Sequence, residues 1–443
     1  MDVKLILEFI VVLAAIAIGA RKSGVALGLW GGVGLLVLVF AFGERPTSPP
    51  IDVMLIILAV IMAASVMEAA GGIDYLVGIA ERIIRRNPQQ VTIVAPLVTW
   101  TFTFLAGTGH IVYPLLPVIY EVSRKAGIRP ERPMSIAAIA SQQAITASPV
   151  AAATAAMIGL FAEKGVGGQW GLEQILVICV PSTLLGVLIA AVVQTRVGRD
   201  LADDPEYQAR LVAGDVESAA AIATMARAEL PRTARPSALI FIAGVVLVVL
   251  AGLFPALRVP PGTTDPVGMP VVIEILMLSI AAVLLLITQV KADLVPRTAT
   301  CRAGTVALVG IFGLAWLGDT FIGAHKETIV ATLGDLAKAA PWTFAFGLFF
   351  ASVLLYSQAA TTRALMPLGL ALGIAPPSLI AMFPAVNGYF FIPTYGTLIA
   401  TINFDRSGTT RIGRYVLNHS FILPGLIATG SAVAIGLLIS RAI

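Results

Sequence analysis

The chain has 443 residues, of which 58% are hydrophobic and only 12% are charged. Soluble domains carry about a quarter charged residues, so this composition indicates an integral membrane protein. The net charge of +4 comes from Lys and Arg residues scattered over loops, and the two cysteines form neither a disulfide framework nor a metal-ligand pair. We therefore expect no nucleic-acid partner, no metal and no cofactor.

Ten apolar stretches are long enough to cross the hydrocarbon core of a bilayer as helices, which takes roughly 20 residues. In chain order they are residues 3–20, 23–42, 51–70, 134–161, 172–195, 237–257, 269–290, 305–323, 376–403 and 417–440. No alternating barrel pattern occurs, so the spans are predicted to be helices. Arg21 and Lys22 follow the first stretch, which is the wrong charge order for a cleavable signal peptide, so this helix is expected to be retained.

Two further apolar regions, residues 91–123 and 341–373, are interrupted near the middle by small polar residues. Each interruption leaves two arms of roughly 16 residues, which is short for a full crossing. We therefore expect two re-entrant helical hairpins, each entering and leaving the membrane on the same side. The stretches before them, 72–88 and 325–341, mix charged and apolar residues at helical spacing and predict amphipathic helices in the membrane interface.

The distribution of Lys and Arg over the loops predicts an orientation in the membrane, and the order of the spans predicts an architecture. Most Lys and Arg residues fall in one alternating set of loops, so the positive-inside rule places both termini outside and the loop 196–236 in the cytoplasm. That loop begins with acidic residues and continues with an Ala-rich stretch. We expect it to be a linker between the two halves, with a helix in the Ala-rich stretch. Three spans, a hairpin, an interrupted span and a last span occur in this order in residues 1–195 and again in residues 237–443.

Because each half has five crossings, an odd number, the two halves are expected to be inverted repeats. Their interrupted spans are 134–161 and 376–403. The predicted fold class is thus an all-α polytopic membrane protein of two inverted repeats, each with five crossings, one of them interrupted, plus one re-entrant hairpin. Interrupted helices in inverted repeats are typical of secondary transporters, whose substrate site lies near the middle of the membrane.

Neither ATP-driven transport nor an enzyme is expected, because the chain has no GxxxxGK[ST] phosphate loop and no HExxH or GxSxG motif in a span. The four interruptions instead combine small or helix-breaking residues with hydroxyl or amide side chains. Half-helix N-termini attract anions through their unpaired N–H groups, and neutral side chains add hydrogen-bond donors. A small carboxylate is therefore the expected substrate. The candidate substrate-binding residues are Thr108, Gly109, Thr146, Ser148, Ser357, Gln358, Thr361, Thr362, Arg363, Asn387 and Thr394.

Arg363 is the only Lys or Arg inside a predicted hairpin, where a guanidinium could bind a carboxylate through two N–H groups. It could instead snorkel to the surface, and the interruptions could serve helix packing alone. His110 is expected to be a neutral hydrogen-bonding residue. Asp319 and Glu68 stand at corresponding points of the two halves and are candidates for coupling H⁺ or Na⁺, or for capping a span end.

Several longer motifs resemble the anaerobic C4-dicarboxylate transporter (Dcu) family over essentially the whole chain: GTGHIVY, RPERPM, ITASP, LLYSQAATT, FIPTYGT and FDRSGTTRIGRYVLNHSFILPG. The resemblance implies a carrier of the bacterial inner membrane that exchanges or takes up fumarate, malate, succinate and aspartate in anaerobic metabolism. It also implies the inverted fold of the ion-transporter superfamily, dimerisation and an elevator-like movement. The family motifs carry over onto Thr108, Gly109, Ser148, Ser357, Gln358, Thr361 and Thr394.

The expected function is therefore secondary transport of C4-dicarboxylates by exchange or by proton-linked uptake, in a homodimer embedded in the lipid bilayer. A monocarboxylate or amino-acid carrier on the same fold is one alternative. A membrane co-sensor with little transport is another, but family members with that role carry an acidic residue after the PTY motif, where this sequence has Leu398.

Overall fold

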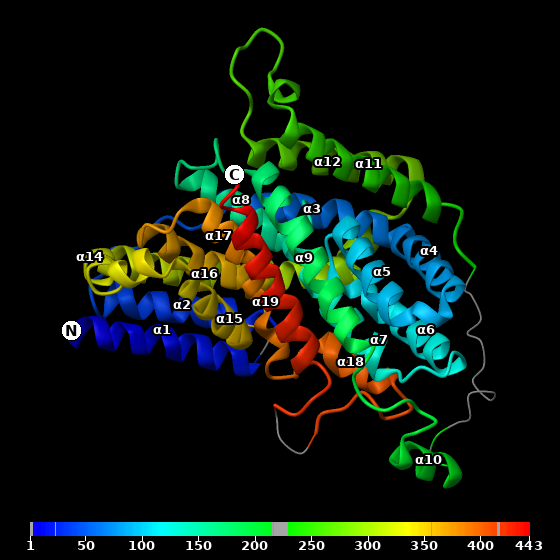
Figure 1. The fold of residues 1–443 in the computed structure, drawn as a ribbon. Helices are drawn as coiled ribbons and strands as arrows, with labels where there is room; N and C mark the ends of the chain where they lie inside the picture. Colours follow the sequence, from blue (N-terminus) through cyan, green and yellow to red (C-terminus); the bar gives the residue numbers. More distant parts are fainter. Residues whose placement is uncertain (1–2, 23, 215, 217–228, 356, 414–416) are drawn as a thin grey trace.

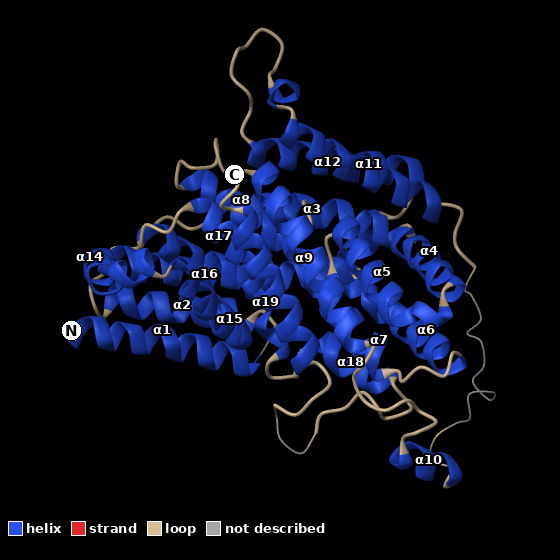
Figure 2. Ribbon diagram, viewed as in Figure 1, coloured by secondary structure: helices blue, strands red, loops and turns tan. Residues whose placement is uncertain are grey.

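The structure, a computed structural model, describes residues 3–22, 24–214, 216, 229–355, 357–413 and 417–443 (Figure 1). These residues fold mainly into helices, and the part of the chain they cover contains no strand (Figure 2). The only extended pairing found there is an isolated antiparallel bridge between Ile412 and His419. The predicted all-α class is confirmed.

The helices of the first half are α1 (Val3–Lys22), α2 (Ala26–Phe40), α3 (Ile51–Ala69), α4 (Gly72–Arg86), α5 (Val91–Ala106), α6 (Val112–Lys125), α7 (Glu131–Gln143), α8 (Ala152–Glu163) and α9 (Leu172–Gln194). The following loop contains α10 (Pro205–Val212). The helices of the second half are α11 (Ala234–Leu253), α12 (Met269–Thr288), α13 (Ala299–Gly310), α14 (Trp316–Ala339), α15 (Phe344–Leu355), α16 (Gln358–Ala371), α17 (Pro376–Met382), α18 (Gly396–Phe404) and α19 (Ile422–Ile439).

Shorter helical turns connect several of these helices. The 3-10 turn η2 (Gly109–Ile111) runs directly into α6, and the 3-10 segment η9 (Phe383–Phe390) follows α17. The π-helical turn η7 (Ile311–Ala315) joins α13 to α14. The remaining 3-10 turns are η1 (Pro88–Gln90), η3 (Ala144–Thr146), η5 (Pro255–Arg258), η6 (Ala292–Arg297) and η8 (Pro341–Thr343).

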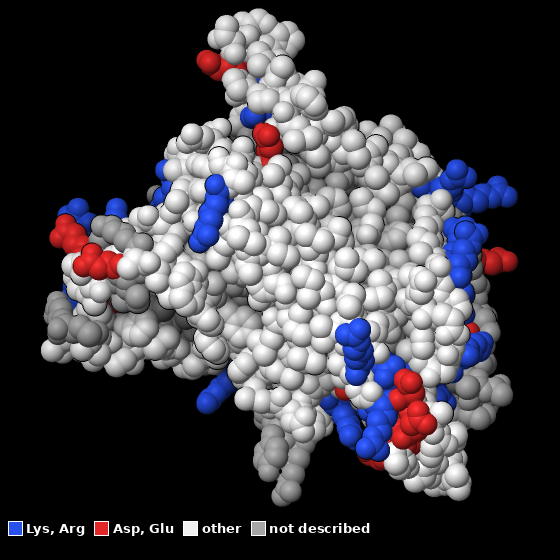
Figure 3. Space-filling model, viewed as in Figure 1, with Lys and Arg blue, Asp and Glu red and all other residues white. Residues whose placement is uncertain are grey.

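Seven helical stretches of the described chain are long and apolar enough to cross a membrane. They are Ile51–Ala69, Pro88–Ala106, Leu172–Gln194, Ala234–Leu253, Met269–Thr288, Ala299–Ile329 and Ile422–Ile439. Figure 3 shows the matching surface pattern, in which uncharged atoms cover the middle of the visible face and Lys and Arg gather toward its edges. Such a distribution suits a multi-pass membrane protein, because a charged side chain inside hydrocarbon is energetically unfavourable.

One part of the second half differs from its prediction. The span predicted at 305–323 and the interfacial helix predicted at 325–341 belong to one continuous helical stretch, formed by α13, η7 and α14. In the first half, Gly71 adopts a left-handed conformation (φ 83°) and separates α3 from α4. No described residue from Ala299 to Ala339 has a positive φ, so nothing there interrupts the helix.

The packing of α2 against the π-helical turn depends on glycine. Among the helices that pack side by side are α9 with α19, α3 with α12, and α2 with η7. A Cβ atom added to Gly28 would collide with the carbonyl oxygen of Val309, and one added to Gly313 would collide with the carbonyl oxygen of Gly28. The two backbones therefore touch directly. Small residues permit this close approach between membrane helices, where van der Waals packing drives association.

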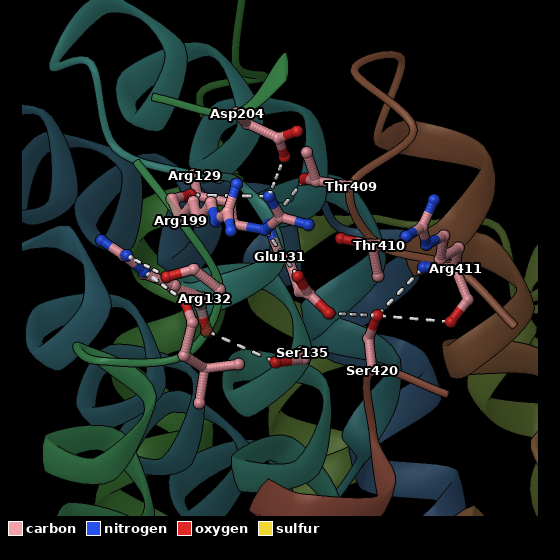
Figure 4. A network of polar contacts seen from close by, with 12 residues as sticks. Arg129, Glu131, Arg132, Ser135, Arg199, Asp204, Thr409, Thr410, Arg411 and Ser420 are labelled. Atoms are coloured by element: carbon pink, nitrogen blue, oxygen red, sulfur yellow. Dashed lines mark hydrogen bonds and ion pairs between the residues drawn. The ribbon is translucent and has the colours of Figure 1, made fainter. Parts of the chain in front are cut away.

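The loop 196–236 begins as an ordered segment that is bound to the ends of neighbouring helices (Figure 4). The guanidinium of Arg129 donates to Glu131 at 2.6 Å and to Asp204 at 2.5 Å. Arg132 donates to the carbonyl oxygen of Val197 at 2.7 Å and to Asp200 at 2.6 Å. The start of the loop is thus held against the segment that joins α6 to α7 and against the first turn of α7. The Ala-rich stretch, predicted to be helical, falls on residues 217–228 and lies outside the described residues.

The loop after α18 joins the same network. Asp405 accepts hydrogen bonds from the backbone N–H of Thr410 at 2.6 Å and from the hydroxyl of Thr409 at 2.8 Å. The hydroxyl of Thr409 accepts in turn from the backbone N–H of Glu131 at 3.1 Å, and Ser420 donates to the Glu131 carboxylate at 2.7 Å. Three segments that are distant in sequence are therefore joined at one end of the helices.

The carboxyl of Asp204 titrates below its ordinary range. Burial by itself would raise the pKa of Asp204, but hydrogen bonds from Arg129 and from the backbone N–H of Tyr207 outweigh this effect and lower it. The contribution of this ion pair is therefore present at every pH above the ordinary Asp pKa of about 4. It is lost only as the pH falls through the lower pKa of the folded state.

We predict that Gly28→Ala destabilises the protein by about 1–3 kcal/mol, the usual effect of overpacking, because its methyl group meets backbone. Gly32→Ala is the matched control on the same helix, since a Cβ atom there would meet nothing within 4 Å. The control should leave stability unchanged or raise it by up to about 1 kcal/mol. Thermal unfolding in detergent, followed by tryptophan fluorescence, measures both variants. Equal melting temperatures would contradict the close contact.

We also predict that Arg129→Gln speeds amide hydrogen exchange in residues 197–212 by about tenfold or more at pH 7, because it leaves Asp204 without its buried partner. Arg199→Gln is the control, since the exposed Arg199 side chain makes no hydrogen bond or ion pair to the described residues. Exchange would be measured by mass spectrometry. The attachment would be refuted if both variants exchanged at the wild-type rate.

Candidate functional site

The first helix break lies between α5 and α6. Gly107 ends α5 in a left-handed conformation (φ 70°), and a Cβ atom there would lie 2.6 Å from the carbonyl oxygen of Val150. Thr108 is extended, and its hydroxyl oxygen accepts from the backbone N–H of His110 at 3.3 Å. Thr108 therefore caps a new helix, which starts at Gly109 and continues through α6. Glycine is required at 107 both for its φ and for the lack of space.

The second break separates α15 from α16 and has the same local form. Ser357 is extended and caps α16, and its hydroxyl oxygen accepts from the backbone N–H of Ala360 at 3.2 Å. A single cap satisfies only part of the first turn, because a helix leaves four N–H groups without an intrahelical partner. Each break therefore ends in a helix N-terminus with partial positive charge and unused donors.

Both N-termini open into one cavity of about 340 Å³, which we call the tip cavity. Its volume lies within the range of small-molecule sites. Its polar lining consists of Thr108, Gly109, His110, Gln142, Thr300, Ser357, Gln358 and Tyr395. None of the described residues that line it is Asp, Glu, Lys or Arg. An anion in this cavity would be held by backbone N–H groups and neutral side chains.

A chain of side-chain amides crosses the wall of the tip cavity. The amide nitrogen of Gln358 donates to Gln142 at 2.9 Å and to Asn387 at 3.2 Å, and Asn387 donates to Gln143 at 3.3 Å. A Cβ atom at Gly109 would collide with the Gln142 amide, so glycine lets this amide lie against the helix tip. The amides are therefore held in fixed orientations, with Asn387 behind Gln358.

Other predicted site residues lie outside the lining of the tip cavity. The hydroxyls of four of them donate to backbone carbonyl oxygens: Thr146 to Gln143 at 2.9 Å, Ser148 to Phe104 at 2.7 Å, Thr361 to Ser357 at 2.8 Å and Thr362 to Gln358 at 2.7 Å. Thr394 is exposed. Of the predicted substrate-binding set, the structure brings together Thr108, Gly109, Ser357 and Gln358.

Arg363 lines a different cavity of about 750 Å³, which we call the arginine cavity. Its Nη2 atom pairs with Glu163 at 2.6 Å and with Asp319 at 3.2 Å. The side chain is only 2% exposed, so in this structure it does not extend to the surface. The prediction that Arg363 lies at the same site as the helix tips is therefore not met by the geometry.

The two acidic candidates for ion coupling have different surroundings. The carboxylate oxygens of Glu68 accept from the backbone N–H groups of Ala299 and Thr300, each at 2.9 Å. Glu68 therefore caps the first turn of α13. Capping a span end was the alternative to ion coupling that the sequence left open for this residue. Asp319, in contrast, lines the arginine cavity beside Arg363.

Sequence reasoning missed Gln142 and gave no site role to His110 or Tyr395, although all three line the tip cavity. The available signal for Gln142 is the pair Gln142-Gln143, two amides inside an apolar span directly before a predicted interruption. For His110 the signal is its place in GTGH. Its Nδ1 atom is buried and has no hydrogen-bond partner among the described residues.

Comparisons with known proteins agree with the motifs. The chain matches the family described as anaerobic C4-dicarboxylate membrane transporter over residues 4–443. It is 43% identical to the C4-dicarboxylate transporter DcuA of Wolinella succinogenes over 440 residues, which covers 98% of this chain and 99% of that protein. It is 41% identical to the anaerobic C4-dicarboxylate transporter DcuB of Escherichia coli O6:H1, with 97% of each chain covered.

Among solved structures, the chain is similar to the YdaH transporter of Alcanivorax borkumensis. The TM-score is 0.60 at 15% sequence identity, and the match covers 99% of this chain and 98% of that one. At this identity the likeness supports the fold alone. The predicted family resemblance, however, is confirmed along the whole sequence: the chain belongs to the anaerobic C4-dicarboxylate membrane transporter family.

Proposed function

We propose that this protein transports C4-dicarboxylates, such as fumarate, malate, succinate and aspartate, across the bacterial inner membrane, and that the substrate binds in the tip cavity. The observation that carries this proposal is the convergence of two capped helix N-termini, at Thr108 and Ser357, in one cavity whose described lining contains no Asp, Glu, Lys or Arg. The names of the relatives, which are C4-dicarboxylate transporters, support the same substrate class.

A dicarboxylate fits two helix tips because it carries an anionic group at each end. One carboxylate would accept N–H groups at the Gly109 tip, and the other would accept N–H groups at the start of α16. Hydrogen bonds to a charged group contribute about 1.5–3 kcal/mol each. The amide of Gln142 lies against the Gly109 tip and accepts a hydrogen bond from Gln358 of α16, so its own N–H groups can donate to the ligand. A monocarboxylate would leave one of the tips without an anion.

The order of helices supports an architecture for this activity. In our proposal α5–α6 and α15–α16 are the two re-entrant hairpins, and α7–α8 and α17–α18 are the two interrupted spans of inverted repeats 1–195 and 237–443. Both termini are then periplasmic, and the loop 196–236 is cytoplasmic. Substrate binding biases the equilibrium between inward-facing and outward-facing states, within a homodimer. Exchange is the proposed mode, and net uptake would be proton-linked.

Reconstituted protein should catalyse counterflow. Liposomes loaded with unlabelled succinate are expected to accumulate labelled fumarate from outside, because the two substrates share one site and exchange through it. Excess aspartate should compete with this uptake and excess lactate should not. Counterflow no greater than in liposomes without protein would refute the proposed function. Competition by lactate as strong as that by aspartate would favour a monocarboxylate carrier.

A substitution in the tip cavity should weaken substrate binding. We expect Gln358→Leu to raise the KM for fumarate by about tenfold or more, because it removes the N–H group that orients the Gln142 amide, the donor to the charged ligand. Thr362→Val is the matched control on the same helix, since the Thr362 hydroxyl donates to its own helix at the carbonyl oxygen of Gln358. The control should keep the wild-type KM. A KM for Gln358→Leu within twofold of wild type would remove Gln358 from the site.

A further inference from the structure

The arginine cavity and the tip cavity lie along the same helices. Helix α8 contributes Ala152 to the tip cavity and Glu163, its last residue, to the arginine cavity. Helix α16 contributes Ser357 and Gln358 at its start to the tip cavity, and Arg363 and later residues to the arginine cavity. It packs against both α8 and α14 (Figure 1). The two cavities therefore lie one after the other along the bundle formed by α8, α14 and α16.

The cavities open near opposite ends of this bundle. Gly24, which precedes α2, lines the tip cavity, whereas Thr47, which follows α2, lines the arginine cavity. The two cavities thus lie near opposite ends of α2, which is about 22 Å long at 1.5 Å per residue. The stretch from α13 to α14 repeats this order, with Thr300 in the tip cavity and Lys326 in the arginine cavity.

The guanidinium of Arg363 is incompletely paired. Both carboxylates, Glu163 and Asp319, contact its Nη2 atom. The Nε and Nη1 atoms are buried and have no hydrogen-bond partner among the described residues. An unpaired donor of a buried charged group is costly, and guanidinium presents five N–H groups suited to carboxylates. Arg363 can therefore take a further or a replacement anionic ligand.

The two carboxylates differ in how readily a ligand could displace them from Arg363. Glu163 ends α8, and its side chain is 25% exposed, whereas Asp319 lies within α14 and its side chain is 12% exposed. A glutamate at a helix end can rotate into water at little cost, while an aspartate held within a helix cannot move as far. Lys164 and Lys326 are exposed residues that line the same cavity. Asp52 is the remaining acidic residue of the lining.

We propose that the arginine cavity is a second carboxylate-binding site, in which a dicarboxylate displaces Glu163 and places one carboxylate on Arg363. This inference rests on the proposed function, because it takes the transported dicarboxylate as the ligand. In this structure the Glu163 carboxylate stands where a ligand carboxylate would bind. The second carboxylate of the ligand pairs with Lys164 or Lys326, both of which line the same cavity. Dicarboxylates arriving from this end of the bundle are held there before they reach the tip cavity.

The test compares the two faces of the membrane. Right-side-out and inverted vesicles from the same cells give the KM of labelled fumarate at each face, with succinate inside. Arg363→Gln should raise the KM about tenfold or more at one face only. Glu163→Gln should lower the KM severalfold at that same face, because it removes the competing carboxylate. A purely structural ion pair predicts the opposite for Glu163→Gln, a loss of transport like that of Arg363→Gln.

Arg258→Gln is the control. Arg258 donates to the carbonyl oxygens of Ala251 and Val267 and lines neither cavity, so this variant should keep the wild-type KM at both faces. If Arg363→Gln is not inserted, Glu163→Gln decides alone: a lower KM at one face supports the site, and an equal or higher KM overturns it. A wild-type protein without counterflow would refute the proposed function, whereas normal counterflow with equal effects at both faces would refute only the second site.

Discussion

A broken helix inside a membrane exposes backbone N–H groups that no water can satisfy, and this constraint organises the structure. Such breaks are tolerated only where they face protein or a polar cavity. In the proposed architecture the chain meets the constraint twice, at Thr108 and Ser357, by capping one N–H with a hydroxyl and turning the rest of the helix tip toward the tip cavity. The side-chain amides of Gln142, Gln143 and Asn387 extend this polar region into the wall of the cavity. They bond to one another and to Gln358, because each buried amide needs hydrogen-bond partners.

In the two proposals, the cavities would use opposite electrostatic means for the same kind of ligand. The tip cavity offers N–H dipoles and neutral amides, whereas the arginine cavity holds a buried guanidinium with two carboxylates. In the proposed function, a permanent unpaired cation in the tip cavity would be energetically unfavourable within the membrane whenever the site is empty. Dipoles carry no net charge, so an empty tip cavity has no such penalty. Arg363 avoids the penalty differently, since Glu163 and Asp319 neutralise it.

The sequence predicted the helix breaks because glycines and hydroxyls interrupt long apolar runs at residues 107–109 and at Ser357. It did not predict which hydroxyls face the cavity. Thr361 and Thr362 lie one turn beyond Ser357 and donate to their own helix, and this depends on rotamers that composition does not encode. The cavity that Arg363 faces depends on neighbouring helices α8 and α14, which are distant in sequence. The sequence also did not predict that α13, η7 and α14 form one continuous helical stretch. The charge pattern of residues 325–341 resembles that of a separate interfacial helix, and no residue type in this region signals that the helix continues.

Helix α16 connects the two proposed sites mechanically. Ser357 at its start and Arg363 farther along belong to one rigid helix, so a shift that pulls Arg363 toward a ligand also moves the helix tip. Helix α8 adds a second connection, because its first turn borders the tip cavity and its last residue, Glu163, pairs with Arg363. Releasing Glu163 would therefore loosen the contact between α8 and α16 at one end only. A ligand that replaces Glu163 would thereby change how these helices are held together at the end that lies away from the tip cavity.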